Sequence, residues 1–228
     1  PEVVSARVGI YGQVETLTGR LAYSFEDDVE RRFRKERLQS QAERYSAFQK
    51  QFPLEPGRYK LSLIVQDHGS GKVGLEDHLI VVPPVQGEEL ETSSVVLANE
   101  VSVPELDEPI GESFVLGKYR VVPTPDDRFT PQDLFAQAYF EVYNLGLDQS
   151  SLTPSVKVEI ALFREGEEIF PFTPINQEYE FDRDRLLVYK TIPFQGLEAG
   201  DYTLRFRVID QIRGESLEKD VEFEMGVS

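Results

Sequence analysis

The chain has 228 residues, of which 40% are apolar, and it carries a net charge of −17 at neutral pH. This length suffices for two domains, and this apolar content suffices for packed cores, so a disordered chain is excluded. The absence of cysteine excludes disulfide frameworks, thiolate catalysis and metal sites with cysteine ligands.

The negative charge is confined to one part of the chain. Residues 1–85 hold 12 basic and 12 acidic residues, whereas residues 86–228 hold 12 basic and 29 acidic ones. The second part therefore carries the whole charge, and such a field repels nucleic-acid phosphates and anionic lipid. We expect no nucleic-acid partner. The acidity is most simply explained by solubility. The alternative explanations are that this part binds calcium or a basic partner.

The sequence shows neither a targeting segment nor a membrane span. It begins at Pro1 without an apolar signal core, and no apolar run approaches the roughly 18 residues that a membrane helix needs. We therefore expect no membrane insertion. The start without methionine suggests a mature or excised fragment.

Residues 1–84 are predicted to form the first domain. Alternating apolar residues predict strands at EVVSARVGIYG (2–12) and TLTGRLAYSFE (16–26). The charged stretch that follows, residues 26–45, lacks Gly and Pro and predicts a short surface helix or a connecting loop. A further strand is expected around residues 45–52.

One six-residue pattern occurs twice, as LEPGRY at residues 54–59 and as LEAGDY at residues 197–202. The longer copies are LEPGRYKLSLIVQD and LEAGDYTLRFRVID, in which apolar residues recur at every second position after the tyrosine. Each copy ends at an aspartate and leads through a polar, glycine-containing turn into a second strand, VGLEDHLIVV or SLEKDVEFEM. Both copies therefore predict β-hairpins.

The repeated pattern has the form of a tyrosine corner. In Greek-key sandwiches, a tyrosine near the start of the sixth strand hydrogen-bonds back to the preceding corner. Glycine would allow the turn, and leucine would fill the core beneath it. The expected corner residues are Leu54, Gly57, Tyr59, Leu197, Gly200 and Tyr202. The sequence thus predicts an all-β chain of two tandem immunoglobulin-like (Greek-key) β-sandwiches, without the usual disulfide and tryptophan.

Residues 85–228 are predicted to form a larger, acidic sandwich of about eight strands. Besides the second hairpin, strands are expected at residues 90–101, 114–125, 134–146, 155–169 and 185–194. Pro and Gly lie at the ends of these segments, as strand breakers do.

The sequence contains few candidates for catalysis. His68 and His78 lack zinc-ligand spacing, and Ser70, His68 and Asp67 are too close in one turn to form a nucleophile–base–orienter triad. A dinucleotide fingerprint and a phosphate-binding loop are both missing. We therefore predict that the chain is not an enzyme and needs no cofactor.

One acidic loop, PTPDDRFTPQD, is a candidate for calcium binding. It holds Asp126, Asp127 and Asp133 between two expected strands, but the spacing of an EF-hand is absent. Solvated loop carboxylates are the favoured interpretation, so calcium stays a disfavoured partner.

An aromatic row follows one face of the strand LFAQAYFEVYNLG. Phe135, Tyr139 and Tyr143 lie on that face together with Gln137 and Glu141. Such a row can stack on a sugar or receive a peptide strand. The favoured interpretation is that the row packs under the neighbouring domain or fills a sheet that is buried on both sides.

Three segments resemble a known bacterial region. They are PGRYKLSLIVQDHGSGKVG, SSVVLANEV and AYFEVYNLGLD, and they are similar to the paired β-sandwich region of proteins with a GWxTD domain and of some von Willebrand factor A-related proteins. The resemblance covers most of residues 45–150 and carries no catalytic residue, and the GWxTD motif itself is absent. It implies an accessory part of a larger bacterial protein that is exported to the periplasm or beyond.

The sequence as a whole favours a non-enzymatic structural or interaction module, whose partner is another protein or other domains of the same chain. The alternative is a carbohydrate-binding module that uses Phe135, Tyr139 and Tyr143. A hydrolase with a carboxylate site in the acidic domain is the least favoured hypothesis.

Overall fold

The computed structural model describes residues 3–34, 48–84, 89–104, 114–124, 126–175, 179–182 and 185–226. These residues form strands and no helix, which confirms the all-β prediction, and they therefore include no helix that could cross a membrane. The chain divides into two compact units. Unit 1 comprises Pro1–Ser46 and Lys50–Gln86, and unit 2 comprises Ala47–Gln49 and Gly87–Ser228.

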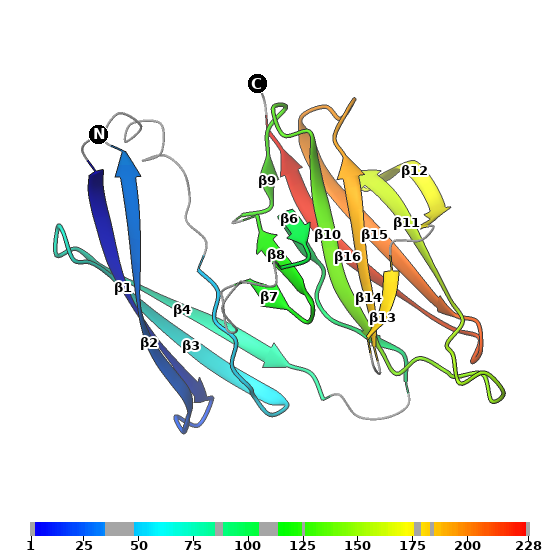
Figure 1. The fold of residues 1–228 in the computed structure, drawn as a ribbon, viewed down its shortest axis with the longest axis horizontal. Helices are drawn as coiled ribbons and strands as arrows, with labels where there is room; N and C mark the ends of the chain where they lie inside the picture. Colours follow the sequence, from blue (N-terminus) through cyan, green and yellow to red (C-terminus); the bar gives the residue numbers. More distant parts are fainter. Residues whose placement is uncertain are drawn as a thin grey trace. The chain divides into compact units, whose positions relative to one another are not determined.

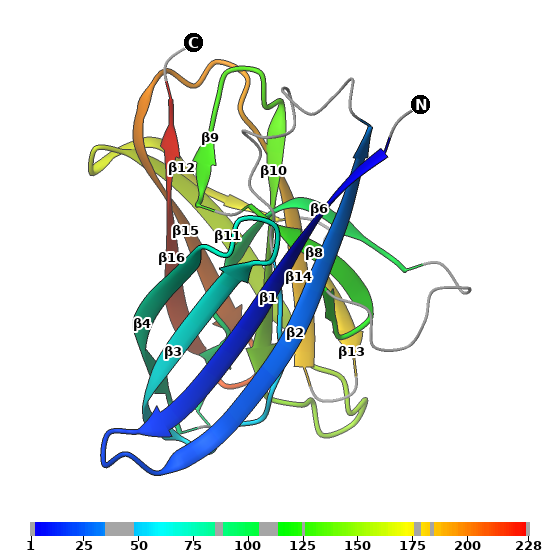
Figure 2. The ribbon, with the colours of Figure 1, turned by 90° about the vertical axis from the view of Figure 1, so that its left-hand side faces the viewer.

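Unit 1 is built on one antiparallel sheet with the strand order β2-β1-β3-β4 (Figures 1 and 2). The strands are β1 (Val3–Thr16), β2 (Leu21–Arg34), β3 (Gly57–Asp67) and β4 (Val73–Val82). The described part of unit 1 thus provides one layer, where the sequence led us to expect a two-layer sandwich.

Two local predictions in unit 1 were wrong. The charged stretch after Glu26 continues β2 as far as Arg34 instead of forming a helix or loop, and the rest of that stretch lies outside the described residues. The expected strand at 45–52 is not a strand where it is described, from residue 48 onward. Phe52 instead stacks its ring on Tyr23 at 4.7 Å, so this segment covers the sheet without pairing with it.

The inner face of the unit 1 sheet is only partly buried. Val14 and Tyr59 are buried, but burial decreases along β3 until Val65 is exposed. Phe25 fits this face because it pairs with Gly12 across the two strands. A Cβ atom at Gly12 would lie 2.2 Å from the Phe25 ring, so this position requires glycine.

Unit 2 contains two sheets that pack face to face (Figure 1). One has the order β13-β14-β10-β6-β8-β7, with β5 also pairing to β10, and the other has the order β12-β11-β15-β16-β9. The strands are β5 (Glu91–Thr92), β6 (Val96–Ser102), β7 (Val115–Leu116), β8 (Tyr119–Pro123), β9 (Arg128–Phe129), β10 (Phe135–Tyr143), β11 (Val156–Arg164), β12 (Glu167–Pro174), β13 (Tyr179–Asp182), β14 (Arg185–Pro193), β15 (Gly200–Asp210) and β16 (Glu215–Met225). Phe140 and Phe206 meet between the sheets, with ring centres 5.0 Å apart.

The sheet of unit 1 has the same strand order as one sheet of unit 2. The order β2-β1-β3-β4 matches β12-β11-β15-β16, and both are antiparallel throughout. The hairpin registers also match, because Leu61 pairs with His78 and Leu204 pairs with Val221, at positions 143 residues apart in each case. Residues 143 positions apart can therefore be compared directly.

Both repeated tyrosines donate a hydrogen bond to the carbonyl oxygen four residues upstream. The Tyr59 hydroxyl lies 2.7 Å from the Glu55 oxygen, and the Tyr202 hydroxyl lies 2.8 Å from the Glu198 oxygen. Each bond closes the turn that precedes the long hairpin.

The other expected corner residues lie close to these tyrosines. Leu197 packs against the main core of unit 2, and Leu54 is half-buried. A Cβ atom at Gly57 would lie 3.3 Å from the Tyr59 ring. At Gly200, where φ is +150°, it would lie 3.1 Å from an Arg164 nitrogen. Both glycines therefore occupy tight positions.

We expect Gly12→Ala to destabilise unit 1 by about 1–3 kcal/mol, because the added methyl group would overlap the Phe25 ring. Urea unfolding followed by tyrosine fluorescence would measure the change. Gly74→Ala is the matched control, since a Cβ atom there meets nothing within 4 Å in the same sheet. Equal effects of the two changes would contradict the packing role of Gly12.

Candidate interaction surface

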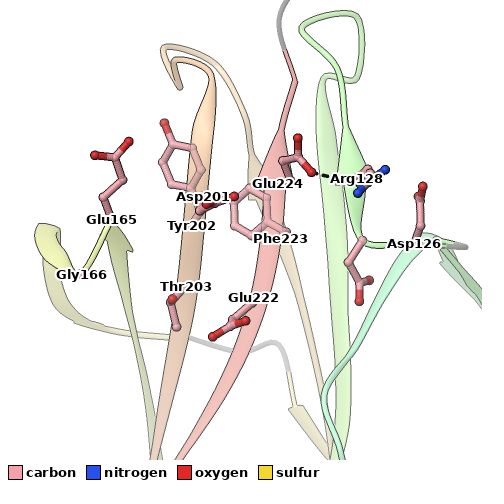
Figure 3. Close-up of a pocket in the computed structure, with 11 residues that line it drawn as sticks. Asp126, Arg128, Glu165, Gly166, Asp201, Tyr202, Thr203, Glu222, Phe223 and Glu224 are labelled. Carbon is pink, nitrogen blue, oxygen red and sulfur yellow. Dashed lines mark ion pairs between the residues drawn. The ribbon is translucent and has the colours of Figure 1, made fainter. Parts of the chain in front are cut away.

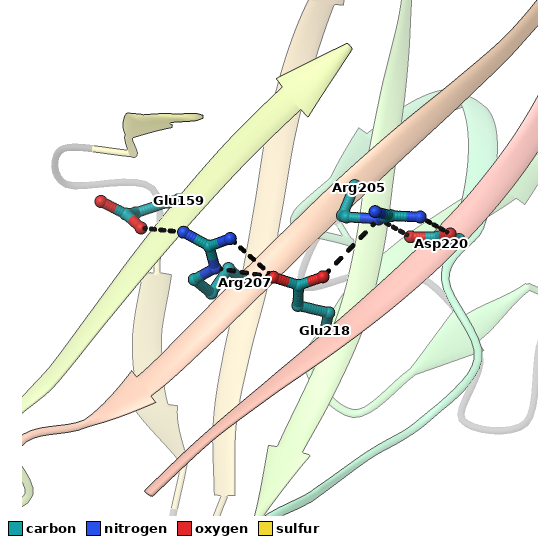
Figure 4. A network of polar contacts seen from close by, with 5 residues as sticks. All are labelled: Glu159, Arg205, Arg207, Glu218 and Asp220. Atoms are coloured by element: carbon teal, nitrogen blue, oxygen red, sulfur yellow. Dashed lines mark hydrogen bonds and ion pairs between the residues drawn. The ribbon is translucent and has the colours of Figure 1, made fainter. Parts of the chain in front are cut away.

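The outer face of the β11-β15-β16 sheet carries a network of ion pairs (Figure 4). Arg205 binds Asp220 through two hydrogen bonds of 2.7 Å. Arg207 pairs with Glu218 at 2.7 Å and with Glu159 at 3.6 Å. The side chains of this network therefore pair with one another on the outer face of unit 2.

The equivalent face of unit 1 is apolar along β4 on either side of the Lys60–Asp77 ion pair. The offset of 143 places Ile64, Leu75, Leu79 and Val81 where unit 2 has Arg207, Glu218, Glu222 and Glu224. Leu75 and Leu79 are 67% and 66% exposed. We define the β4 surface as Val73, Leu75, Leu79 and Val81 of β4 together with Ile64 of β3. Asp77, with its partners Lys60 and Ser62, divides this surface into two groups of exposed apolar side chains, and these require an explanation.

The backbone of the β4 residues of this surface faces the open edge of the sheet. At the start of the hairpin, Asp67 N–H donates to Lys72 C=O, and antiparallel pairs alternate between bonded and non-bonded. Even-numbered residues of β4 therefore direct their backbone groups toward β3. Odd-numbered ones direct theirs outward, and they are Val73, Leu75, Asp77, Leu79 and Val81. Among the described strands, β4 pairs with β3 alone.

The opposite edge of the sheet has a different character. His68 N–H donates to Arg7 C=O, so odd-numbered residues of β1 bond to β3 and even-numbered ones bond to β2. The even-numbered residues of β1 pair with odd-numbered residues of β2, so the even-numbered residues of β2 direct their backbone groups outward. The outward residues of β2 are Ser24, Glu26, Asp28, Glu30 and Arg32, and all are exposed and polar. Charged side chains along an edge discourage pairing with another chain. The β2 edge has this protection along its length, whereas only Asp77 is charged among the outward residues of β4.

In unit 2 the corresponding edge is occupied at one end. The short strand β9 pairs in parallel with β16, and Glu224 N–H donates to the Asp127 carbonyl at 3.0 Å. Gly226 N–H donates to the Phe129 carbonyl at 2.8 Å. The strand that corresponds to β4 therefore has a partner on its outer side.

Unit 2 also has an acidic cleft of about 540 Å³ (Figure 3). Its charged lining consists of Asp126, Asp127, Glu165, Asp201, Glu222, Glu224 and Arg128. Burial, and then repulsion from Asp126, raises the pKa of Asp127 above its ordinary value. Within the described ranges, no group of three or more His, Cys, Asp or Glu side chains could hold a metal ion. Asp133, the third carboxylate weighed for calcium, instead accepts the Thr130 N–H at 2.7 Å.

The aromatic row of β10 is not an exposed ligand face. Tyr139 is 2% exposed and packs in a second, smaller cluster with Tyr119 and Leu187. Of the three residues, Phe135 is exposed and Tyr143 is half-buried. The carbohydrate-binding alternative therefore loses its central stacking residue, because the side chains of Tyr119 and Leu187 pack against Tyr139.

A buried polar network occupies the face that was considered as an alternative ligand site. Glu141 accepts hydrogen bonds from Tyr139 at 2.9 Å, from Tyr143 at 2.8 Å and from Arg185 at 2.8 Å. Burial, and then the hydrogen bond to Glu141, raises the pKa of Tyr139. The sequence reasoning missed Arg185. The only available signal was one carboxylate, Glu141, in a strand that is apolar on both faces.

The two histidines lie in separate surface pairs. His68 contacts Asp28 at 3.0 Å, and His78 contacts Glu76 at 3.1 Å. The Ser70 hydroxyl donates to Asp67 at 2.6 Å, so the three residues weighed as a triad are not joined in that order.

The aspartates that end the two repeats stabilise turns. Asp67 accepts the Gly69 N–H at 2.8 Å, and the buried Asp210 accepts the N–H groups of Gly146 at 2.6 Å and Ile212 at 2.8 Å. The repeated aspartate thus closes the turn of each hairpin.

No model of a known protein family matches the chain, and no curated protein matches it either.

We expect Arg185→Met to destabilise unit 2 by roughly 2–4 kcal/mol, because it leaves the Glu141 carboxylate buried without its cation. Arg205→Met is the matched control. It breaks an ion pair in contact with water and should cost less than about 1 kcal/mol. Chemical unfolding of both variants gives the comparison, and equal losses would refute the buried role of Arg185.

We also expect two loop aspartates to titrate on opposite sides of the ordinary value. The Ser150 hydroxyl and the Ser151 N–H hold the pKa of Asp148 at about 2, whereas burial raises the pKa of Asp127. Carboxyl carbon shifts recorded by NMR against pH would measure both values. An Asp127 pKa at or below its ordinary value would contradict the burial of that carboxyl group.

Proposed function

We propose that this chain is a non-enzymatic protein-interaction module of a larger, exported bacterial protein, and that β4 of unit 1 is its contact strand. The observation that carries the proposal is the contrast between the two edges of one sheet. The outward residues of β2 are polar, whereas four of the five outward residues of β4 are apolar. A free edge with apolar side chains can accept an additional strand from a partner.

The comparison with unit 2 supports this proposal. At the positions of Leu75 and Leu79, the matching strand has Glu218 and Glu222, and β9 pairs along its outer side. The same strand order is therefore compatible with a hydrated, partly closed surface. The apolar residues of β4 are not required by the fold, which favours a role in binding.

The state of the polar groups supports the non-enzymatic part of the proposal. Glu141 is engaged by three side chains, and Asp210 is engaged by backbone N–H groups. Each histidine contacts a carboxylate at the surface. In the described part of the chain, these contacts bring together no nucleophile with a general base.

We further propose that the two units are tandem immunoglobulin-like domains with tyrosine corners. Immunoglobulin domains place strands D, E and B together in one sheet and C, F and G in the other. The orders β13-β14-β10 and β11-β15-β16 fit this scheme, and β1-β3-β4 repeats its second part. The hydrogen bonds of Tyr59 and Tyr202 support the corner assignment.

The proposal predicts that short extended peptides bind along β4. Peptides selected from a display library against the whole chain should shift the amide NMR signals of Val73, Leu75 and Leu79 more than those of β2. Leu79→Lys should weaken binding at least tenfold, because it places a charge within the apolar surface. Leu17→Lys is the control, since Leu17 is equally exposed but lies in the β1–β2 turn. Selected peptides that bind elsewhere, or equally to both variants, would contradict the proposal.

A further inference from the structure

The open edge of β4 has the same residue order in both directions. Its outward residues are Val73, Leu75, Asp77, Leu79 and Val81, so the pattern is Val-Leu-Asp-Leu-Val. An antiparallel partner strand with this pattern places valine opposite valine and leucine opposite leucine. Such self-complementarity is the property that a symmetric pairing between identical chains requires.

We propose that the partner of the β4 edge is a second copy of this chain, whose β4 pairs antiparallel about Asp77. This inference rests on the proposed function and identifies its partner. The two unit 1 sheets would continue as one sheet across a twofold axis at Asp77. Five bonded residue pairs would supply on the order of ten backbone hydrogen bonds.

Side chains on both faces fit this register. On the apolar face, Leu75 lies opposite Leu79 of the partner subunit, and the β4 surfaces of the two copies become continuous. On the other face, Glu76 lies opposite His78 of the partner subunit, an acidic residue facing one that can carry positive charge. Cross-strand pairs of these kinds stabilise antiparallel sheets.

Neighbouring registers fit less well. Moving the axis to His78 places Asp77 opposite a leucine and the two histidines opposite each other, whereas moving it to Glu76 opposes the two glutamates. A slip by one residue brings opposite faces together. The chosen register has one unfavourable pair, Asp77 with its own copy. Lys60 at 2.9 Å and Ser62 at 2.6 Å bind each of these carboxylates within its own chain.

The distribution of charge favours contact between copies at unit 1. Residues 1–85 hold equal numbers of basic and acidic residues, whereas residues 86–228 carry the whole charge of −17. Two copies of unit 2 repel each other, and two copies of unit 1 have no net charge to oppose their approach. The neutral unit is also the one with the apolar edge.

The chain contains no cysteine, so single cysteines can report the register directly. In the complete chain, Asp77→Cys places the two thiols opposite each other with Cα atoms about 5.5 Å apart, within disulfide range. Val73→Cys is the control. It is exposed on the same strand, but the two copies lie about 27 Å apart in this register. We expect mild oxidation to link Asp77→Cys chains at least tenfold faster than Val73→Cys chains, and equal rates would overturn the register.

Sedimentation equilibrium of the unmodified chain gives an independent test. We expect twice the mass of one chain at high micromolar concentration, the mass of a single chain for Leu79→Lys, and a dimer for Leu17→Lys. A monomeric chain whose β4 binds selected peptides would overturn this inference and leave the proposed function intact. A monomeric chain without peptide binding at β4 would overturn both.

Discussion

The structure depends on one requirement of β-sheets, namely that each face and each edge must be covered, paired or made polar. In unit 2 the inner face meets a second sheet at Phe140 and Phe206, and the outer face carries the ion pairs of Arg205 and Arg207. In unit 1 a sheet with the same strand order is covered on part of its inner face by Phe52. Its β4 edge keeps exposed apolar side chains at Val73, Leu75, Leu79 and Val81 within the described residues.

The local parts of the fold could be predicted from the sequence because they depend on neighbouring residues. The alternation after Tyr59 and Tyr202 predicts both hairpins, and their ending at Asp67 and Asp210 follows from short turn contacts. The continuation of β2 beyond Glu26 could not be predicted in this way. Its charged residues lie on an edge strand, where pairing with β1 outweighs their weak strand preference.

Burial of individual side chains depended on contacts between distant segments. A binding face at Phe135, Tyr139 and Tyr143 stayed open as an alternative, because nothing in the local sequence shows that Tyr119 packs against Tyr139. The alternation within β4 was visible in the same way. Whether the side chain of Leu79 is covered depends on whether a second layer packs on that face of unit 1, and the residues around Leu79 do not show this.

The two units therefore have the same strand order but different side chains on the solvent-facing surface of the sheet. Carboxylates at Glu218 and Glu222 keep the face of unit 2 hydrated, and they also make that face repel its own copy. Leu75 and Leu79, at the same positions in unit 1, reverse both effects at once. If β4 pairs with a second copy as we propose, the apolar edge provides the contact in the unit without net charge, and the acidity of unit 2 opposes any other association between the copies.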